Sequence, residues 1–438
     1  MAARKKRTLT LEEQLEAVLV PEDEWPYEVP NNWCWIRLLD SFVNKTDSKK
    51  KIAQKLYKNY GDIAIVDQGE KLIGGYTDDS ELQYAGRLPV IIFGDHTRRL
   101  KYVDFPFAQG ADGVKVLLPK PFIDPKFFFY ALQNVDIPNL GYRRHFPLFK
   151  NFCIPLPSMH EQRLIVQRVE HFYSKLDDAE AELRKVIDSS EQRQTAVLHR
   201  AFSGQLTETW RKEHDISQET WTKKTLGEVC TSIFDGDHMP PPKASKGIPF
   251  LVISNVNNGH LSFEDTRFVP EDYYNNLTVT RKPEIGDILY TLVGSYGIPV
   301  MVDDERPFCF QRHVALLKPR DIEQKFLWYL LRSPIMFEKA TAIATGTAQL
   351  TVPIKGLRNL AFDCPGNEER AEIIRQLDVL LSKEEQMLAA VRNVLEVTAL
   401  TRQSILAKAF RGELGTNNPG ELSSKALLAN ILSGNAGK

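Results

Sequence analysis

The sequence predicts a mixed α/β protein of the α+β class. In this architecture two globular domains are separated by two long antiparallel coiled-coil helices that form a pseudo-twofold repeat. Three observations predict it. One stretch of the chain occurs twice, each copy carries apolar residues at heptad spacing, and each copy follows a region of short apolar runs bounded by turns.

The repeat aligns residues 157–206 with residues 365–414 without a gap, at a constant offset of 208. The match is closest at its end, where the pattern Ala-Phe-x-Gly-x-Leu occupies residues 201–206 and 409–414. A gapless match of this length indicates two copies of one structural unit.

Both copies place mostly apolar residues at alternating steps of four and three, from residue 165 to 197 and from residue 373 to 405. This spacing is typical of a long coiled-coil helix. The sequence also predicts the helix boundaries, through a capping box of Ser158 with Glu161 and through stop glycines at Gly204 and Gly412. Polar residues within the heptad pattern could fix the register; they are Ser190, Arg193, Glu384, Thr398 and Thr401.

A helix of about 45 residues is roughly 65 Å long, and alone it would expose its apolar stripe to water. The simplest solution packs the two copies against each other in antiparallel orientation. The alternative is two separate helical hairpins, each in its own core. We favour the paired spacer.

The chain therefore divides into segments with distinct patterns. The expected segments are an N-terminal helical segment (1–24), a first globular domain (25–157), a first spacer helix (158–206), a linker (207–220), a second globular domain (221–365), a second spacer helix (366–414) and a C-terminal tail (415–438). We expect the tail to be flexible, with a partner-binding helix as the alternative. Within the globular domains, strands are predicted at 88–93, 113–118, 285–290 and 313–317, and short amphipathic helices at 126–134 and 325–333.

Composition excludes several classes of protein. Lys plus Arg (56) nearly equals Asp plus Glu (57), so the bulk charge of -1 gives no polyanion signal, although a local one remains open. The five cysteines lie far apart, which argues against a disulfide scaffold and a structural zinc site. No apolar run reaches the roughly 18 residues of a membrane span. We expect a cytoplasmic protein.

Loops of both globular domains carry residues suited to nucleic acid. Arg can pair with guanine, Asn or Gln with adenine, and Lys with phosphate, although any one cluster could equally be a solvated surface. The candidates in the first domain are Lys45, Lys49, Lys50, Arg98, Arg99, Tyr142, Arg143 and Arg144. Those in the second are His238, Lys243, Lys246, Asn255, Asn257, Ser295, Tyr296, Arg312, His313, Thr347 and Gln349.

Motifs for catalysis were not found. The chain has no GxxxxGK[ST] phosphate loop, no GxGxxG and no Asn/Asp-Pro-Pro-Tyr/Phe tetrapeptide of adenine methyltransferases. Glu323 and Lys325 resemble half of a nuclease site, and Asp235, Asp237 and His238 could bind a metal. We interpret the first pair as a surface ion pair and the second group as a turn. We expect no catalytic residue, no metal and no cofactor in this chain.

Several motifs in this order resemble the specificity (S) subunit of Type I restriction–modification enzymes, over about residues 10–414. They are Pro26-Tyr27-Glu28-Val29-Pro30 before Trp33, the helix entry at 157–162, the two Ala-Phe-x-Gly-x-Leu exits, and the segments 247–251 and 344–349. The resemblance implies two target recognition domains that each read one half of a split, asymmetric double-stranded DNA sequence.

The resemblance also implies partners. The helical spacer would set the gap between the two half-sites and dock two methyltransferase subunits, and restriction/translocase subunits would complete the assembly. Adenine N6 methylation, ATP-driven translocation and cleavage would belong to those partners, together with S-adenosylmethionine, ATP and Mg. Two other functions are alternatives: a coiled-coil scaffold with protein-binding globular ends, and a chain that is itself a methyltransferase or nuclease.

Overall fold

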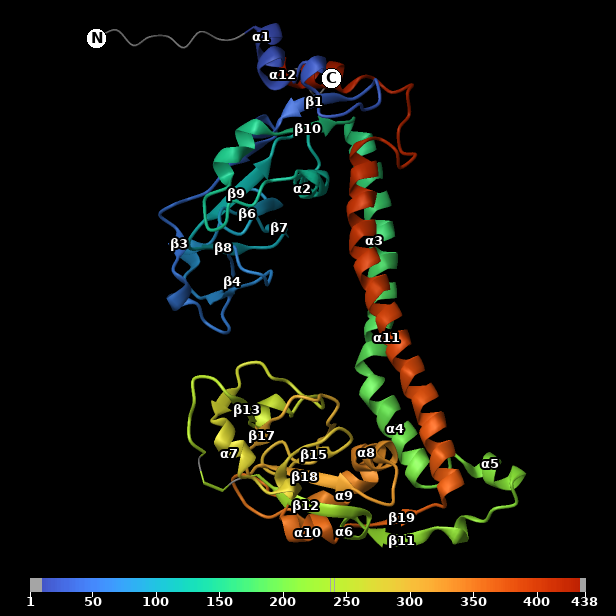
Figure 1. Ribbon diagram of the computed structural model, residues 1–438. Helices are drawn as coiled ribbons and strands as arrows, with labels where there is room; N and C mark the ends of the chain where they lie inside the picture. Colours follow the sequence, from blue (N-terminus) through green and yellow to red (C-terminus); the bar gives the residue numbers. More distant parts are fainter. Residues whose placement is uncertain (1–9, 237, 240, 434–438) are drawn as a thin grey trace. The chain divides into compact units, whose positions relative to one another are not determined.

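The computed structural model describes residues 10–236, 238–239 and 241–433, and it divides into two compact units. Unit 1 comprises Met1–Glu182 and Asn393–Lys438, and unit 2 comprises Leu183–Arg392. Each unit contains one globular region of strands and short helices and one part of the long helices (Figure 1). The predicted α+β class is confirmed.

The globular region of unit 1 is built on two four-stranded sheets. The first has the order β2-β9-β6-β7 and is antiparallel throughout, with strands Phe42–Asn44, Val114–Pro119, Val90–Gly94 and Leu100–Val103. The second has the order β3-β8-β4-β5, with strands Lys51–Ile52, Phe107–Gly110, Ile63–Val66 and Gly75–Thr77. Strand β6 is a continuous apolar run that is buried along its whole length, as expected for a central strand.

Shorter elements complete unit 1. Helix α2 (Pro125–Asn134) begins at the N-cap Asp124, whose carboxylate accepts the backbone N–H groups of Lys126 and Phe127. Strands β1 (Cys34–Arg37) and β10 (Cys153–Leu156) form an antiparallel pair before the entry to the long helix α3. Helix α1 (Leu11–Val18) precedes them.

Unit 2 repeats this plan. Its main sheet has the antiparallel order β12-β18-β15-β16, with strands Cys230–Asp235, Val314–Pro319, Ile288–Thr291 and Pro299–Met301. A three-stranded sheet has the order β14-β13-β17 (Arg267–Val269, Ile248–Leu251, Cys309–Phe310), and β11 (Thr222–Thr225) pairs with β19 (Ala361–Cys364). The order of the main sheet matches that of unit 1, strand for strand.

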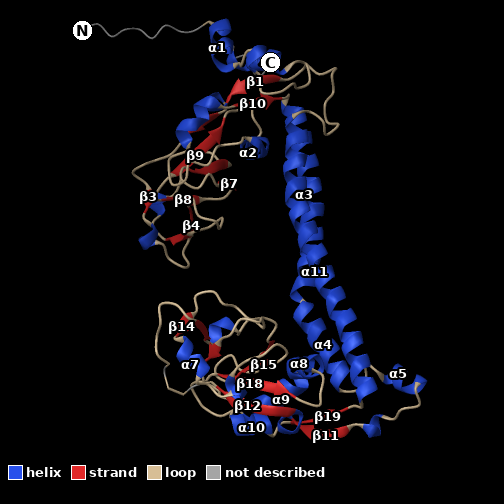
Figure 2. Ribbon diagram, in the orientation of Figure 1, coloured by secondary structure: helices blue, strands red, loops and turns tan. Residues whose placement is uncertain are grey.

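The helices of unit 2 are short outside the spacer (Figure 2). They are α5 (Glu208–Glu213), α6 (Leu226–Val229), α7 (Glu271–Asn275), α8 (Gln324–Arg332), α9 (Pro334–Ile343) and α10 (Ile354–Arg358). Helix α8 corresponds to α2 of unit 1, as the sequence predicted, and it buries Phe326, Leu327 and Leu330.

The long helices are α3 (Met159–Asp188), α4 (Ser190–Phe202) and α11 (Asn367–Phe410). In unit 1 the Tyr173 hydroxyl donates to the Arg402 carbonyl (3.1 Å), and the Arg402 guanidinium donates to Asp177 (2.6 Å). In unit 2 Arg193 of α4 pairs with Glu384 of α11 (2.7 Å). From the Tyr173–Arg402 contact to the Arg193–Glu384 contact the residue numbers rise along α3 and α4 and fall along α11, as in the predicted antiparallel coiled coil and unlike two separate hairpins.

Two details of the spacer prediction were wrong. The first helix is interrupted at Ser189, which has non-helical angles (φ −86°, ψ 0°) although its backbone bonds to Lys185 (3.0 Å) and from Arg193 (3.1 Å) are kept. The Ser189 hydroxyl also donates to the Lys185 carbonyl, a contact that often bends helices. In the second helix the predicted apolar positions Leu380, Met387 and Val394 are exposed, whereas Leu381 and Leu388 are buried. The buried stripe takes two successive steps of four because a straight helix turns once in 3.6 residues, not in 3.5.

The helix boundaries follow the prediction in part. Gly204 and Gly412 adopt the positive φ angles (+79° and +75°) of C-terminal stops. At the start of α3, the Ser158 hydroxyl accepts the Glu161 backbone N–H at 3.1 Å, but the Glu161 carboxylate does not complete the capping box. It accepts the indole N–H of Trp33 instead, at 2.7 Å.

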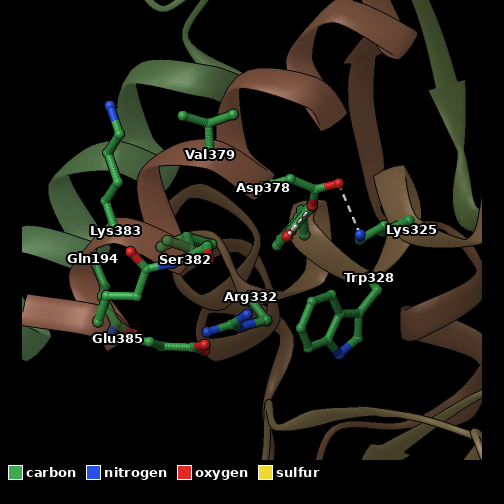
Figure 3. Close-up of a pocket in the computed structure, with 12 residues that line it drawn as sticks. Gln194, Lys325, Trp328, Arg332, Asp378, Val379, Ser382, Lys383 and Glu385 are labelled. Carbon is green, nitrogen blue, oxygen red and sulfur yellow. Dashed lines mark hydrogen bonds and ion pairs between the residues drawn. The ribbon is translucent and has the colours of Figure 1, made fainter. Parts of the chain in front are cut away.

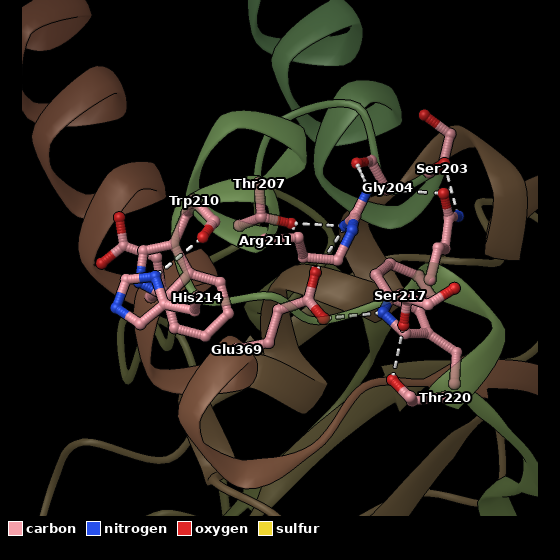
Figure 4. A network of polar contacts seen from close by, with 12 residues as sticks. Ser203, Gly204, Thr207, Trp210, Arg211, His214, Ser217, Thr220 and Glu369 are labelled. Atoms are coloured by element: carbon pink, nitrogen blue, oxygen red, sulfur yellow. Dashed lines mark hydrogen bonds and ion pairs between the residues drawn. The ribbon is translucent and has the colours of Figure 1, made fainter.

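The repeat preserves this indole–carboxylate contact. In unit 2 the indole N–H of Trp221 donates to Glu369 at 2.8 Å, and Glu369 stands 208 positions after Glu161. Glu369 also accepts from Thr207 and forms a buried ion pair with Arg211 (Figure 4). Glu161 has no cation beside it among the described residues; its second contact is the Asn417 amide at 3.1 Å.

The C-terminal tail differs from the flexible segment that we expected. Residues 424–432 form helix α12 (Ser424–Leu432), which packs against α1 in unit 1. The Ser424 N–H donates to the Asn32 carbonyl at 2.8 Å, and Leu428 is 1% exposed within the same core as Val18. Leu428, Ile431 and Leu432 of the tail therefore pack in the core of unit 1.

Candidate nucleic-acid interface

In unit 1, two loops bring basic and aromatic candidates together. One is the turn between β6 and β7, and the other is residues 138–145, which follow α2. The ring of Tyr142 stacks on the ring of His96, with centroids 4.7 Å apart and an interplanar angle of 12°. Tyr142 is 84% exposed. Arg143 and Arg144 are exposed, and neither makes a hydrogen bond or ion pair with the residues that the structure describes.

The buried side chain of His145 anchors this second loop. The Leu140 N–H donates to its Nε2 at 3.1 Å, so Nε2 is the acceptor and Nδ1 carries the proton, which it donates to the Asp95 carbonyl at 2.8 Å. The Asp95 carboxylate in turn accepts the backbone N–H groups of His145 and Phe146. These hydrogen bonds therefore fix the loop that carries the exposed residues 142–144.

The other candidates of unit 1 have different environments. Arg98 is half-buried and donates to the Ile137 carbonyl (2.8 Å), which ties the two loops together, and exposed Arg99 lies 3.6 Å from Glu70. Lys45 and Lys49 are exposed between β2 and β3, whereas the Lys50 ammonium donates to the Glu81 carbonyl at 2.5 Å. No contact among the described residues joins these lysines to the loop of Tyr142.

In unit 2, three loops are joined by backbone hydrogen bonds. The Leu292 N–H donates to the His313 carbonyl (2.8 Å), and the Gly294 N–H donates to the Leu350 carbonyl (3.0 Å). Their candidates therefore gather in one loop cluster, namely Ser295, Tyr296, Arg312, His313, Thr347 and Gln349. Arg312, Thr347 and Gln349 are exposed.

Two residues of this cluster are constrained. The ring of Tyr296 stacks on Phe337 (5.6 Å), and its hydroxyl donates to Thr341 at 3.0 Å. Burial, and secondarily the neighbouring charge of Arg312, lowers the pKa of His313. The neutral imidazole, which can both donate and accept a hydrogen bond, is therefore favoured near neutral pH.

The prediction that Asn255 contacts DNA was wrong. It is 6% exposed, its amide oxygen accepts the Val252 N–H (2.9 Å), and its amide nitrogen donates to the Glu264 carbonyl (3.0 Å). Both ends of the amide are occupied inside the fold, so Asn255 cannot read a base. Nearby Asn257 is half-exposed.

The remaining candidates of unit 2 border the cluster or lie apart from it. Lys243 and Lys246 are exposed before β13. His238 lies 2.9 Å from Asp235. Gly236, which follows Asp235, donates its backbone N–H to the carbonyl of Val314, the residue after His313. Asp237, the third residue of the weighed metal group, lies outside the described residues. Within the described part of the chain, no group of three or more His, Cys, Asp or Glu could hold a metal ion.

The Glu-x-Lys pair at the start of α8 serves packing. Glu323 forms an ion pair with Arg370 (2.6 Å) and Lys325 with Asp378 (2.8 Å), so each side chain holds α8 to α11. Sequence reasoning missed the positioning roles of Asp95, His96 and His145. The sequence carried one weak signal: Asp95 and His96 directly follow a buried strand, and His145 ends a basic run. It could not show that these residues contact one another, because about fifty residues separate them in the chain.

The family model described as "Type I restriction modification DNA specificity domain" matches residues 30–189 and 218–396. The specificity subunit of Type I restriction enzyme EcoBI from Escherichia coli is 28% identical over 70% of this chain and 71% of its own length. That of EcoKI, from Escherichia coli strain K12, is 27% identical over 64% and 63%.

Two solved structures share the fold. One is a chain from work on complex assembly and conformational transition of the type I R-M system, with a TM-score of 0.61 and 20% identity over 89% of this chain and all of that one. The other is the HsdS subunit from Thermoanaerobacter tengcongensis, with a TM-score of 0.54 and 22% identity over 89% and 99%. Among the described residues, no helix is long and apolar enough to cross a membrane.

Proposed function

The chain belongs to the Type I restriction modification DNA specificity family, whose model matches most of its length, and from this premise we propose that its two globular regions each read one half of a bipartite, asymmetric DNA target. The predicted S-subunit resemblance is confirmed by the family match and by the specificity subunits among its relatives. The chain is accordingly a DNA-specificity component of a restriction–modification system.

One observation carries the proposal of two different half-sites. In both units, some of the candidate residues stand on the same two topological positions: the connection between the two adjacent strands β6 and β7, or β15 and β16, and the loop that follows the helices after the sheet. Arg312 and His313 lie in a third place, the turn between β17 and β18, which a backbone hydrogen bond joins to these loops of unit 2. The side chains at these positions differ. Unit 1 presents Tyr142, Arg143 and Arg144, whereas unit 2 presents Ser295 and Gln349.

The chemistry of these side chains fits base and phosphate contacts. An exposed Arg without a protein partner can pair with guanine in the major groove or with a phosphate, and Gln can pair with adenine. Equivalent loops with different donors and acceptors would select different bases. We therefore propose residues 142–144 as the main readers of one half-site and Arg312, His313 and Gln349 as those of the other, with the exposed lysines holding phosphate.

The proposal extends to the partners. We propose that the chain itself is not catalytic and that the paired helices dock two methyltransferase subunits, with restriction/translocase subunits joining the assembly in the cytoplasm. Those partners would bind S-adenosylmethionine, ATP and Mg and would carry out adenine N6 methylation and cleavage. The support is family membership and the relatives' names, together with the twofold repeat of the helical segments.

Methylome sequencing tests the proposal. The chain is co-expressed with its methyltransferase partner in a host without other adenine methyltransferases, and methyladenine is mapped along the genome. The expected result is one split motif with two unrelated halves and a constant gap. A stable complex that leaves the genome unmethylated would contradict the proposal and favour the coiled-coil scaffold.

A further inference from the structure

Unit 2 contains a cavity of about 630 Å³, open to solvent on one side, where α8 lies against the spacer helices α4 and α11 (Figure 3). Its size is within the range of small-molecule sites in proteins, about 300–1,000 Å³. The lining is rich in polar side chains, including Arg332, Lys325, Asp378, Glu385 and Gln194. The cavity is separate from the loops that carry the DNA-binding candidates.

Arg332 is the unusual group in this cavity. Its guanidinium carbon lies 4.4 Å from the ring centroid of Trp328 and 6.0 Å from that of Tyr329, so the planar group stacks on an aromatic platform. It makes no hydrogen bond and no ion pair with the residues that the structure describes. Burial lowers the pKa of Arg332 from its ordinary value, although the group stays charged.

None of the other charged groups that line the cavity forms an ion pair with Arg332. Asp378 is engaged by two side chains, because Lys325 donates to one of its oxygens (2.8 Å) and the Tyr329 hydroxyl donates to the other (2.6 Å). Glu385 lines the cavity and stabilises the charge of Arg332 from a distance, without forming an ion pair. The ammonium group of Lys383 points away from Arg332 (Figure 3).

Comparison with unit 1 shows that a helix at this position can pack on the spacer without an Arg–Trp stack. Lys325 and Asp378 correspond to Lys126 and Glu170 of unit 1, which form the same kind of ion pair at 2.6 Å. Lys325 follows Lys126 by 199 positions and Asp378 follows Glu170 by 208, and at the offset of 199 Trp328 and Arg332 correspond to Phe129 and Gln133. Unit 1 therefore attaches its helix to the spacer without an arginine on an indole, and packing alone does not explain the pair in unit 2.

We propose that this cavity is an anion-binding site in which the Arg332 fork, held flat on Trp328, binds a phosphate or carboxylate group of a small molecule. The five N–H donors of arginine match the paired oxygens of both groups, and a partly desolvated guanidinium binds them more strongly than an exposed one. Gln194 and Ser382 also line the cavity and offer neutral hydrogen-bond donors for the remaining oxygens.

Calorimetric titration of the full chain with inorganic phosphate and, separately, with succinate tests this site. We expect at least one of the two anions to bind once per chain, and which one binds identifies the anionic group. Arg332→Gln should weaken that binding by about tenfold or more, since a charge-assisted bidentate contact is lost. Arg332→Lys, which keeps the charge but not the fork, should fall between wild type and Arg332→Gln.

Arg392→Gln is the matched control, because Arg392 is an exposed arginine of α11 outside the cavity lining. It should bind the anion like wild type, and all variants should show wild-type circular dichroism. The proposal is overturned if neither anion binds, or if Arg392→Gln loses as much affinity as Arg332→Gln. It is also overturned if Arg332→Gln binds as tightly as wild type.

Discussion

Glu161 and Glu369 occupy equivalent positions of the repeat, yet the same substitution should affect them differently. Glu369 is 2% exposed and pairs with Arg211, which is 5% exposed. Glu369→Gln would remove the charge that compensates a buried guanidinium, a change that costs about 3–5 kcal/mol in typical buried pairs. Hydrogen bonds from Arg211 to Gly204 and Thr207 remain in this variant. We therefore expect the loss of stability to lie at the lower end of this range, about 3 kcal/mol.

Glu161→Gln should cost about 1 kcal/mol or less. Among the described residues no cation lies beside Glu161, and one of its oxygens is buried without a hydrogen-bond partner there. A glutamine oxygen still accepts the Trp33 N–H. Burial raises the pKa of Glu161 above 4.5, against the lowering effect of the Trp33 and Asn417 hydrogen bonds.

This raised pKa sets the sign of the pH dependence. The folded state holds the proton more tightly than the unfolded chain, so the contribution of Glu161 to stability is fully present below pH 4.5 and is lost as pH rises through the folded-state pKa. Glutamine does not ionise, so the variant does not lose stability at this position as the pH rises. Relative to wild type, Glu161→Gln should therefore gain stability as the pH rises from about 4 to 7.

Urea unfolding at several pH values measures these changes, and hydrogen exchange with mass spectrometry assigns them to unit 1 or unit 2. The double variant Arg211→Met with Glu369→Gln is the control, since it removes both charges and should be more stable than Glu369→Gln alone. The reasoning is refuted if Glu161→Gln destabilises unit 1 as much as Glu369→Gln destabilises unit 2.

Three further predictions concern the candidate interface and Asn255, which the fold excludes from it. Arg143→Ala should weaken DNA binding and, if Arg143 contacts phosphate, reduce the slope of log affinity against log salt by about 1, as measured by fluorescence anisotropy across a salt series. An unchanged affinity and slope would remove Arg143 from the interface. His145→Ala should speed hydrogen exchange in residues 138–145 and weaken DNA binding, although it touches no base; wild-type exchange would show that the loop is held by other contacts. Asn255→Ala should destabilise unit 2 by about 1–3 kcal/mol in urea unfolding, because it leaves the Val252 N–H and the Glu264 carbonyl unpaired.

Local patterns predicted most of the fold. Strand β6 was predictable because its apolar run is continuous, and Gly204 and Gly412 because a helix stop favours a residue that adopts positive φ. The heptad pattern predicted paired helices but misplaced Leu380 and Met387, since a rigid seven-residue template does not follow the drift of a straight helix.

The sequence could not predict which side chains the folded loops bind internally, nor the contacts between residues far apart along the chain. Asn255 looked like a reader of adenine because its type fits, and only the fold shows its amide bonded to Val252 and Glu264. The tail looked flexible because its apolar residues are few, but Leu428 packs with α1, more than 400 residues earlier. The stack of Tyr142 on His96 likewise joins two loops that no periodicity connects.

The central claim is that each globular region reads its own half of one DNA target, and methylome sequencing of paired variants tests it most directly. One variant carries Arg143→Ala with Arg144→Ala, and the other carries Arg312→Ala with Gln349→Ala, each co-expressed with the methyltransferase partner. We predict that each pair relaxes the sequence of one half of the motif and leaves the other half and the gap unchanged. Relaxation of the same half by both pairs, or of neither half by either pair, would contradict the claim.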